Sequence, residues 1–91
     1  MHRLKAEHKR LLRALAEGHT LKAHRDIEGH KEFRLHFSDG RPSEPVERRH
    51  PEELVEAGLI DSNKKFPAAT FWLTERGRAV AAELLQEAGP R

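Results

Sequence analysis

A chain of 91 residues is long enough for one small domain, and the absence of cysteine excludes disulfides, thiolate metal sites and cysteine nucleophiles. So short a chain has no room for a deep substrate cavity with a separate core behind it, so we expect a binding protein rather than an enzyme, with no cofactor. No stretch approaches the roughly 20 apolar residues of a transmembrane helix, and the charged start of the chain is not followed by an apolar run. We therefore expect a cytoplasmic protein without membrane contact.

The charge is unevenly distributed along the chain, although the formal net charge is only +2. Residues 1–25 hold seven Lys/Arg and two Glu, whereas residues 44–61 hold two Arg against five Glu and one Asp. This asymmetry indicates where an anionic partner could bind. The 35% of charged residues, with a single Asn and a single Gln, is typical of thermophiles or of GC-rich genomes, and composition does not separate the two.

The first expected element is an amphipathic helix over residues 4–17, ended by Gly18. Apolar residues recur at helical spacing on its inner side, at Leu4, Leu11, Leu12 and Leu15. Its outer side is basic and includes Lys5, Lys9 and Arg13.

Residues 20–37 predict a β-hairpin around the turn Asp26-Ile27-Glu28-Gly29, because Asp in the first position and Gly in the fourth suit a type I turn with a left-handed glycine. This turn pairs His24 with Glu32 and Leu21 with Leu35, and the alternation of apolar residues gives the same register. The expected core side carries Leu21, Ala23, Phe33, Leu35 and Phe37. The opposite side carries Lys22, His24, His30, Glu32, Arg34 and His36.

The second half of the chain predicts a helix, a second hairpin and a final helix. A loop over residues 38–42 and a short extended piece around Pro45-Val46 lead to a helix over 51–57 that stops at Gly58. The second hairpin has strands near 59–62 and 70–74, with Phe71 and Leu73 inward and Trp72 outward. Thr74 caps the last helix, over 75–87, and Gly77 near its start permits close approach to a neighbour.

Two segments of the second half carry recognisable motifs: Leu54-Val55-Glu56-Ala57-Gly58-Leu59-Ile60 and Phe71-Trp72-Leu73-Thr74-Glu75-Arg76-Gly77-Arg78. They resemble the wing region of the MarR and PadR winged-helix regulators, which have "L-x-x-x-G-L-I" before the wing and "L-T-x-x-G-R" after it. The resemblance covers about residues 50–88 and implies a small α+β, winged-helix-like domain. A hairpin at 20–37 stands where such regulators have a scaffold helix. The order helix, hairpin, short helix, hairpin wing, helix also resembles a small bacterial family of YjhX-like toxins, through Arg25-Asp26, Gly29 and Gly58-Leu59-Ile60.

The leading functional expectation is a transcription-associated regulator that contacts the phosphates of double-stranded DNA through its wing and its first helix. The expected contacts are Lys64, Lys65, Arg76, Arg78, Lys5, Lys9 and Arg13. The helix before the wing exposes Glu52, Glu53 and Glu56, which phosphates would repel. It is therefore not expected to lie deep in the major groove.

The alternative is a protein-interaction module, such as an adaptor, an inhibitor or a toxin-like protein, or a homodimer. Trp72 and Phe66 are the expected interface residues, since an outward tryptophan is a frequent interface anchor. A contiguous basic surface would favour DNA, and a basic face segregated from Trp72 would favour protein docking. The sequence leaves both open.

Metal binding and catalysis have weaker support. His24, His30 and Glu32, near Asp26, offer imidazole and carboxylate groups, but their spacing is no ligand motif and their strand face is open. We expect cross-strand ion pairs and hydrogen bonds there instead of a metal. Ser38, Ser43 and Ser62 lie in turns outside any nucleophile motif, so no catalytic residue is predicted.

Overall fold

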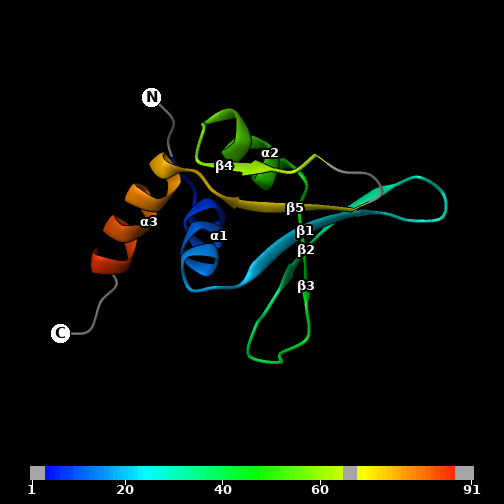
Figure 1. Ribbon diagram of the computed structural model, residues 1–91, viewed down its shortest axis with the longest axis horizontal. Coiled ribbons are helices and arrows are strands. Elements are labelled where there is room, and N and C mark those ends of the chain that lie inside the picture. The colour runs from blue at the N-terminus through cyan, green and yellow to red at the C-terminus, as the bar shows by residue number, and fades with distance from the viewer. Residues whose placement is uncertain (1–3, 65–67, 88–91) are drawn as a thin grey trace.

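The computed structural model describes residues 4–64 and 68–87. In chain order the elements are α1 (Ala6–Ala16), β1 (Thr20–Arg25), β2 (Lys31–His36), β3 (Glu44–Val46), α2 (Arg49–Glu56), β4 (Ile60–Ser62), β5 (Ala68–Leu73) and α3 (Glu75–Glu87). All five strands form one antiparallel sheet in the order β3-β2-β1-β5-β4 (Figure 1). The α+β class is confirmed. The expected order of elements was incomplete, because the extended piece around Pro45 is a third strand and the two hairpins share one sheet.

The register of the first hairpin agrees with the expectation from its turn. Leu21 lies opposite Leu35 and His24 opposite Glu32, and Gly29 has a φ of +88°. The sequence did not reveal that β1 also pairs with β5, through Leu21 with Phe71. This second pairing is possible because both strands place apolar side chains on the same face.

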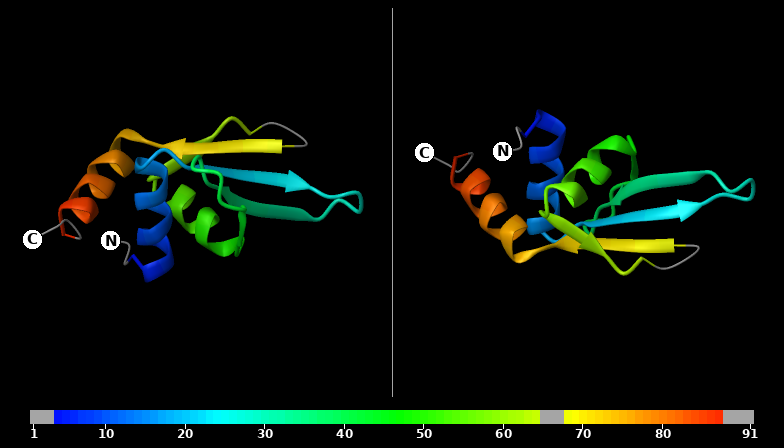
Figure 2. Two further views of the ribbon diagram at one scale, coloured as in Figure 1. Left: turned by 90° about the horizontal axis from the view of Figure 1, so that it is seen from below. Right: turned by 90° about the horizontal axis from the view of Figure 1, so that it is seen from above.

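Helices cover only one face of the sheet. Both views of Figure 2 show α1 and α2 on the same side of the strands, and α3 packs beside α1 at the end where β5 finishes. The core between them is built from Leu11, Leu12, Ala14, Leu21, Ala23, Phe33, Leu35, Val46, Leu54, Ala57, Leu59, Ile60, Ala69, Phe71, Leu73, Ala81 and Leu84. Among the described residues, no helix is long and apolar enough to cross a membrane.

The start of α2 differs from the expectation. The helix begins at Arg49 rather than at residue 51. Backbone N–H groups in the first turn of a helix have no partner inside the helix, so Pro51, which lacks an N–H, fits at any position of that turn. His50 consequently belongs to the helix and is buried. The first helix also differs slightly, starting at Ala6 rather than at Leu4.

Two glycines end the first two helices as expected. Gly18 has a φ of +100° and Gly58 a φ of +76°, the left-handed conformation that a side chain disfavours. Behind Gly58, the Leu59 N–H donates to Leu54 O at 3.0 Å and the Gly58 N–H to Val55 O at 3.0 Å. These two bonds form a Schellman motif, so the chain turns sharply from α2 into β4.

The junction of β5 and α3 rests on Thr74. Its N–H donates to Leu59 O at 3.0 Å, and its hydroxyl donates to Gly58 O at 2.6 Å while accepting from the Gly77 N–H at 3.0 Å. Thr74 therefore caps α3 and ties the helix to the segment that ends α2. The expectations for Thr74 and Gly77 are confirmed.

Candidate functional site

The wing residues expected to bind DNA lie at the two ends of β5. Lys64 is exposed, and the preceding residue, Asn63, donates its N–H to Thr70 O near the start of β5. Arg76 and Arg78 follow the far end of β5, at least about 10 Å further along the strand direction. Lys65 and Phe66 lie outside the described residues. The described wing cations therefore do not form one cluster.

Arg76 and Arg78 are both exposed, and both reach backbone carbonyls. Nη1 of Arg78 donates to Leu73 O at 3.2 Å, and Nη1 of Arg76 lies 3.5 Å from Ala57 O. These contacts give hydrogen-bond partners to carbonyl groups at the C-terminal ends of β5 and α2. Each arginine thus has a structural task beside any contact with phosphate.

The basic side of α1 is partly neutralised by neighbours. Arg10 forms ion pairs with Glu7 at 2.8 Å and with Glu44 at 3.0 Å. Lys5 lies against α2, in a hollow that Glu53 also lines. Lys5, Lys9 and Arg13 on this side form no ion pair with any described residue.

The acidic helix α2 is less uniform than the sequence suggests. Glu56 is exposed, and Glu52 is exposed but pairs with Arg48 at 2.9 Å. Glu53 is turned toward α1, where it accepts a hydrogen bond from His8 at 2.7 Å. That bond, followed by the charge of Lys5, holds the pKa of Glu53 below its usual value. The expectation that all three glutamates are exposed is right for Glu52 and Glu56, whereas Glu53 is only partly exposed.

The face of the sheet that no helix covers gathers basic side chains from β1 and β2. Lys22 lies opposite Arg34, and the rings of His24 and His36 are 6.0 Å apart. Burial lowers the pKa of His36, and the positive charges of Lys22, His24 and Arg34 lower it further. We call Lys22, His24, Arg34 and His36 the basic sheet patch.

Nearby acidic groups neutralise only part of the positive charge of this patch. Arg34 pairs with Glu32 at 3.0 Å and donates to the Ser43 hydroxyl at 2.8 Å, whereas Lys22 forms no ion pair with any described residue. Glu32 thus pairs with Arg34 on its own strand, β2, and the described residues show no ion pair between Glu32 and its cross-strand neighbour His24, where one was expected. The sequence placed these residues on one face, but it did not show that the pairing of β1 with β5 brings Trp72 beside them.

Trp72 joins the basic sheet patch from β5. It points away from the core between the buried Phe71 and Leu73, as expected, and is 46% exposed. It also borders a hollow of about 480 Å³ where α1, β5 and α3 meet. The lining is mostly apolar and consists of Leu15, Ala16, His19, Phe71, Trp72, Leu73, Arg78, Ala82 and Leu85.

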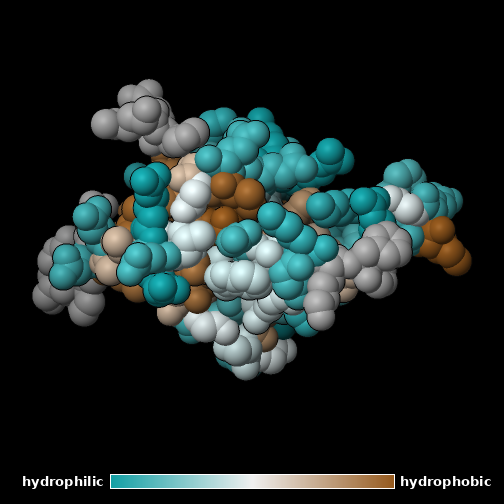
Figure 3. Space-filling view, turned by 45° about the horizontal axis from the view of Figure 1, so that its top comes forward, coloured by the Kyte–Doolittle hydropathy of each residue, from teal (hydrophilic) through white to brown (hydrophobic). Residues whose placement is uncertain are grey.

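The tip of the first hairpin carries a second exposed apolar group. Ile27 is fully exposed, and Figure 3 shows a hydrophobic projection at the right-hand end of the molecule, over this turn. Beside it, Asp26 forms an ion pair with His30 at 3.4 Å. Asp26, Glu28 and His30 form an exposed group that does not include His24 or Glu32.

The uncovered sheet face therefore combines cations with an exposed aromatic ring, a combination suited to an anionic, ring-containing partner. No family model, curated protein or solved structure matches the chain.

Proposed function

We propose that the chain binds nucleic acid through the uncovered face of its sheet, as a winged-helix-like module associated with transcription. The observation that carries the proposal is the position of Trp72 on the same open face as Lys22 and Arg34. A cationic surface attracts the phosphate backbone, and an aromatic side chain offers a stacking surface to any base.

The spacing on the face supports simultaneous contact with a base and a phosphate. Lys22 is paired with Thr70, and Trp72 lies two residues further along β5 on the same face. The Cα atoms of Lys22 and Trp72 are therefore about 8 Å apart. A base stacked on Trp72 would leave a neighbouring phosphate within reach of the Lys22 ammonium group.

This geometry favours unpaired bases over the double-stranded DNA expected from the sequence. A side chain on a flat sheet face stacks only on a base whose ring is accessible, as in a single strand. The acidic surface of α2, with Glu52 and Glu56 exposed, also argues against insertion of that helix into a major groove. Lys64 lies at the edge of the wing and could add a phosphate contact.

The test uses fluorescence anisotropy of labelled random-sequence oligonucleotides, single-stranded and duplex, at low and moderate salt. Trp72 is the only tryptophan, so quenching of its emission reports stacking directly. We expect tighter binding to the single strand, quenching of Trp72, and at least about tenfold weaker binding for Lys22→Glu. Lys9→Glu, a charge reversal on α1, is the matched control and should bind like wild type.

Two results would contradict the proposal. One is the absence of binding even at low salt. The other is wild-type affinity for Lys22→Glu together with loss of affinity for Lys64→Glu, which would move the contact from the sheet face to the wing.

A second candidate function is docking of a protein on the hollow beside Trp72. Its apolar lining, with Leu15 and Leu85 on opposite helices, is the observation that favours it. A second copy of the chain is the simplest occupant to test. Sedimentation velocity over a concentration series should then show a dimer that Leu85→Glu abolishes and Lys22→Glu does not.

A further inference from the structure

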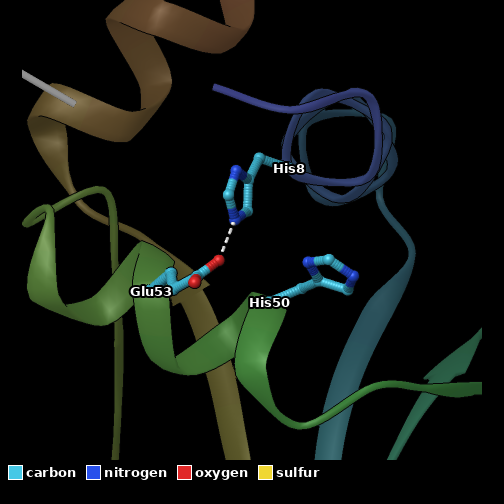
Figure 4. A group of neighbouring side chains, drawn as sticks. All are labelled: His8, His50 and Glu53. Carbon is cyan, nitrogen blue, oxygen red and sulfur yellow. Dashed lines mark hydrogen bonds and ion pairs between the residues drawn. The ribbon is translucent and has the colours of Figure 1, made fainter. Parts of the chain in front are cut away.

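A cluster of three side chains joins α1 to α2 on the helix side of the sheet. His50 and Glu53 lie three residues apart on α2 and so share one face of that helix, and His8 faces them from α1 (Figure 4). His8 Nε2 is 2.7 Å from Glu53 Oε1, and the two imidazole rings meet edge to face with centroids 5.4 Å apart. One potential ligand atom from each residue lies within 4.8 Å of the other two.

We propose that His8, His50 and Glu53 bind one divalent transition-metal ion of the zinc type. Two imidazole nitrogens and one carboxylate oxygen form a common three-ligand set for zinc, whose fourth position stays open to water. Ligand atoms around tetrahedral zinc are about 3.3 Å apart, so the cluster needs a closing movement of only about 1.5 Å. The nitrogen ligands favour zinc over magnesium or calcium, which prefer all-oxygen sites.

A second observation, independent of the ligand distances, comes from the buried ring of His50. It is 7% exposed, and its Nδ1 is buried without a hydrogen bond to any described residue. Figure 4 shows one ring nitrogen of His50 turned toward His8, and His50 Nε2 lies 3.6 Å from Glu47 Oε1 on the outer side. A proton on Nε2 would face the Glu47 carboxylate and leave the Nδ1 lone pair free for a metal. A carboxylate behind a ligating histidine is the usual arrangement in such sites.

The two hydrogen bonds of the His8 ring suit the metal-free state. To bind an ion, His8 must give up the hydrogen bond from its Nε2 to Glu53. Its Nδ1 accepts the Lys5 N–H at 3.0 Å, so the ring proton is on Nε2 and is donated to Glu53. When Nε2 binds the ion, that proton moves to Nδ1 through solvent, so the imidazole remains neutral and no net proton is released from it. The protonated Nδ1 can no longer accept the Lys5 N–H, so metal binding requires the exposed residue Lys5, just before α1, to shift away from the ring.

The surroundings allow entry and a fourth ligand. A hollow of about 240 Å³ opens beside the cluster, lined by Leu4, Lys5, His8, Glu53, Leu54, Glu56 and Ala57. The Glu53 side chain is 43% exposed there, so an ion can reach its carboxylate from solvent. In this hollow the negative charge of Glu56 and the positive charge of Lys5 cancel. The remaining negative charge, which attracts the ion, is that of Glu53.

The test titrates tag-free protein with Zn²⁺ by calorimetry and with Co²⁺ by visible absorption, which reports coordination geometry. We expect one ion per chain, and a loss of affinity of at least about 100-fold for His50→Gln and for Glu53→Gln. The matched control is His30→Gln, which removes the histidine of the exposed Asp26, Glu28 and His30 group and should bind like wild type. Long-range ¹H–¹⁵N spectra should show Zn²⁺-induced shifts at His50 Nδ1 and His8 Nε2.

The proposal would be overturned by the absence of saturable binding at one ion per chain. It would also be overturned if His50→Gln and Glu53→Gln bound like wild type, or if only His30→Gln lost the ion. Far-UV circular dichroism of the apo variants establishes that they fold. Should His50→Gln not fold, Glu53→Gln and the imidazole shifts of the wild-type protein decide, because Glu53 is half exposed and its replacement leaves the core intact.

Discussion

Gly77 packs directly against the backbone carbonyl of Leu59, with no room for a side chain between α3 and the start of β4. The contact brings the first turn of the last helix onto the segment that links α2 to β4. Thr74 binds the same segment through Gly58 and Leu59. The position of α3 is thus fixed by backbone contacts rather than by side-chain shape alone.

Replacing Gly77 by alanine should lower the free energy of unfolding by about 1–3 kcal/mol, because a Cβ atom would collide with rigid backbone and force α3 outward. The gain of about 1 kcal/mol in helix propensity would offset only part of this loss. Urea denaturation followed by far-UV circular dichroism measures the change. Gln86→Ala, at an exposed position of the same helix, should stay within about 0.5 kcal/mol of wild type. An unchanged midpoint for Gly77→Ala would show that α3 shifts without cost.

The cap of α3 gives a second prediction. Thr74→Val keeps the shape of the side chain but removes both hydroxyl hydrogen bonds, to Gly58 O and from the Gly77 N–H. We expect a loss of about 1–2 kcal/mol in the same denaturation experiment. Thr74→Ser retains the hydroxyl and should recover most of that stability. Equal losses for the two variants would mean that the methyl group, not the hydroxyl, stabilises the junction.

Salt dependence separates phosphate contacts from base contacts on the sheet face. If Lys22 contacts one phosphate, Lys22→Ala should reduce the slope of log affinity against log salt concentration by about one unit. Trp72→Ala should weaken binding by about tenfold while leaving that slope unchanged, since stacking releases no counterions. Anisotropy titrations at four salt concentrations supply both numbers. A change of slope for Trp72→Ala would contradict its assignment as a stacking residue.

The depressed pKa of His36 predicts a pH dependence of stability. In the unfolded chain His36 titrates near its ordinary value of 6.5, whereas burial and the charges of Lys22, His24 and Arg34 lower its pKa in the folded state. Between the two values the unfolded state binds more protons, so the free energy of unfolding falls as the pH drops through 6.5. His36→Gln should flatten this part of the profile between pH 8 and pH 5, measured by urea midpoints. A profile that keeps the wild-type slope would assign the effect to other groups.

A bound phosphate should change the same titration. Negative charge beside Lys22 favours the protonated form of His36, so a saturating oligonucleotide should raise the pKa of this imidazole. An NMR titration of the His36 ring with and without the oligonucleotide measures the shift. No change would place the nucleic acid away from the basic sheet patch.

Local features of the chain were predictable because short-range rules govern them. The turn at Asp26 and Gly29 and the alternation of apolar residues determine the register of the first hairpin. Gly18 and Gly58 end their helices, and Thr74 with Gly77 starts the last one, as their conformational and capping preferences require. The outward position of Trp72 follows from the same alternation.

The sequence by itself determined the elements other than β3, most of their ends and the face on which each residue of the two hairpins lies, since these depend on neighbours a few positions away. Only the tertiary structure decided which elements meet. The pairing of β1 with β5 places Trp72 near Lys22, and the packing of α1 on α2 brings His8 within 2.7 Å of Glu53, 45 positions away. An earlier helix start also turned His50 into the core. Contacts between distant segments depend on how the whole core packs, and no local pattern in the chain encodes them.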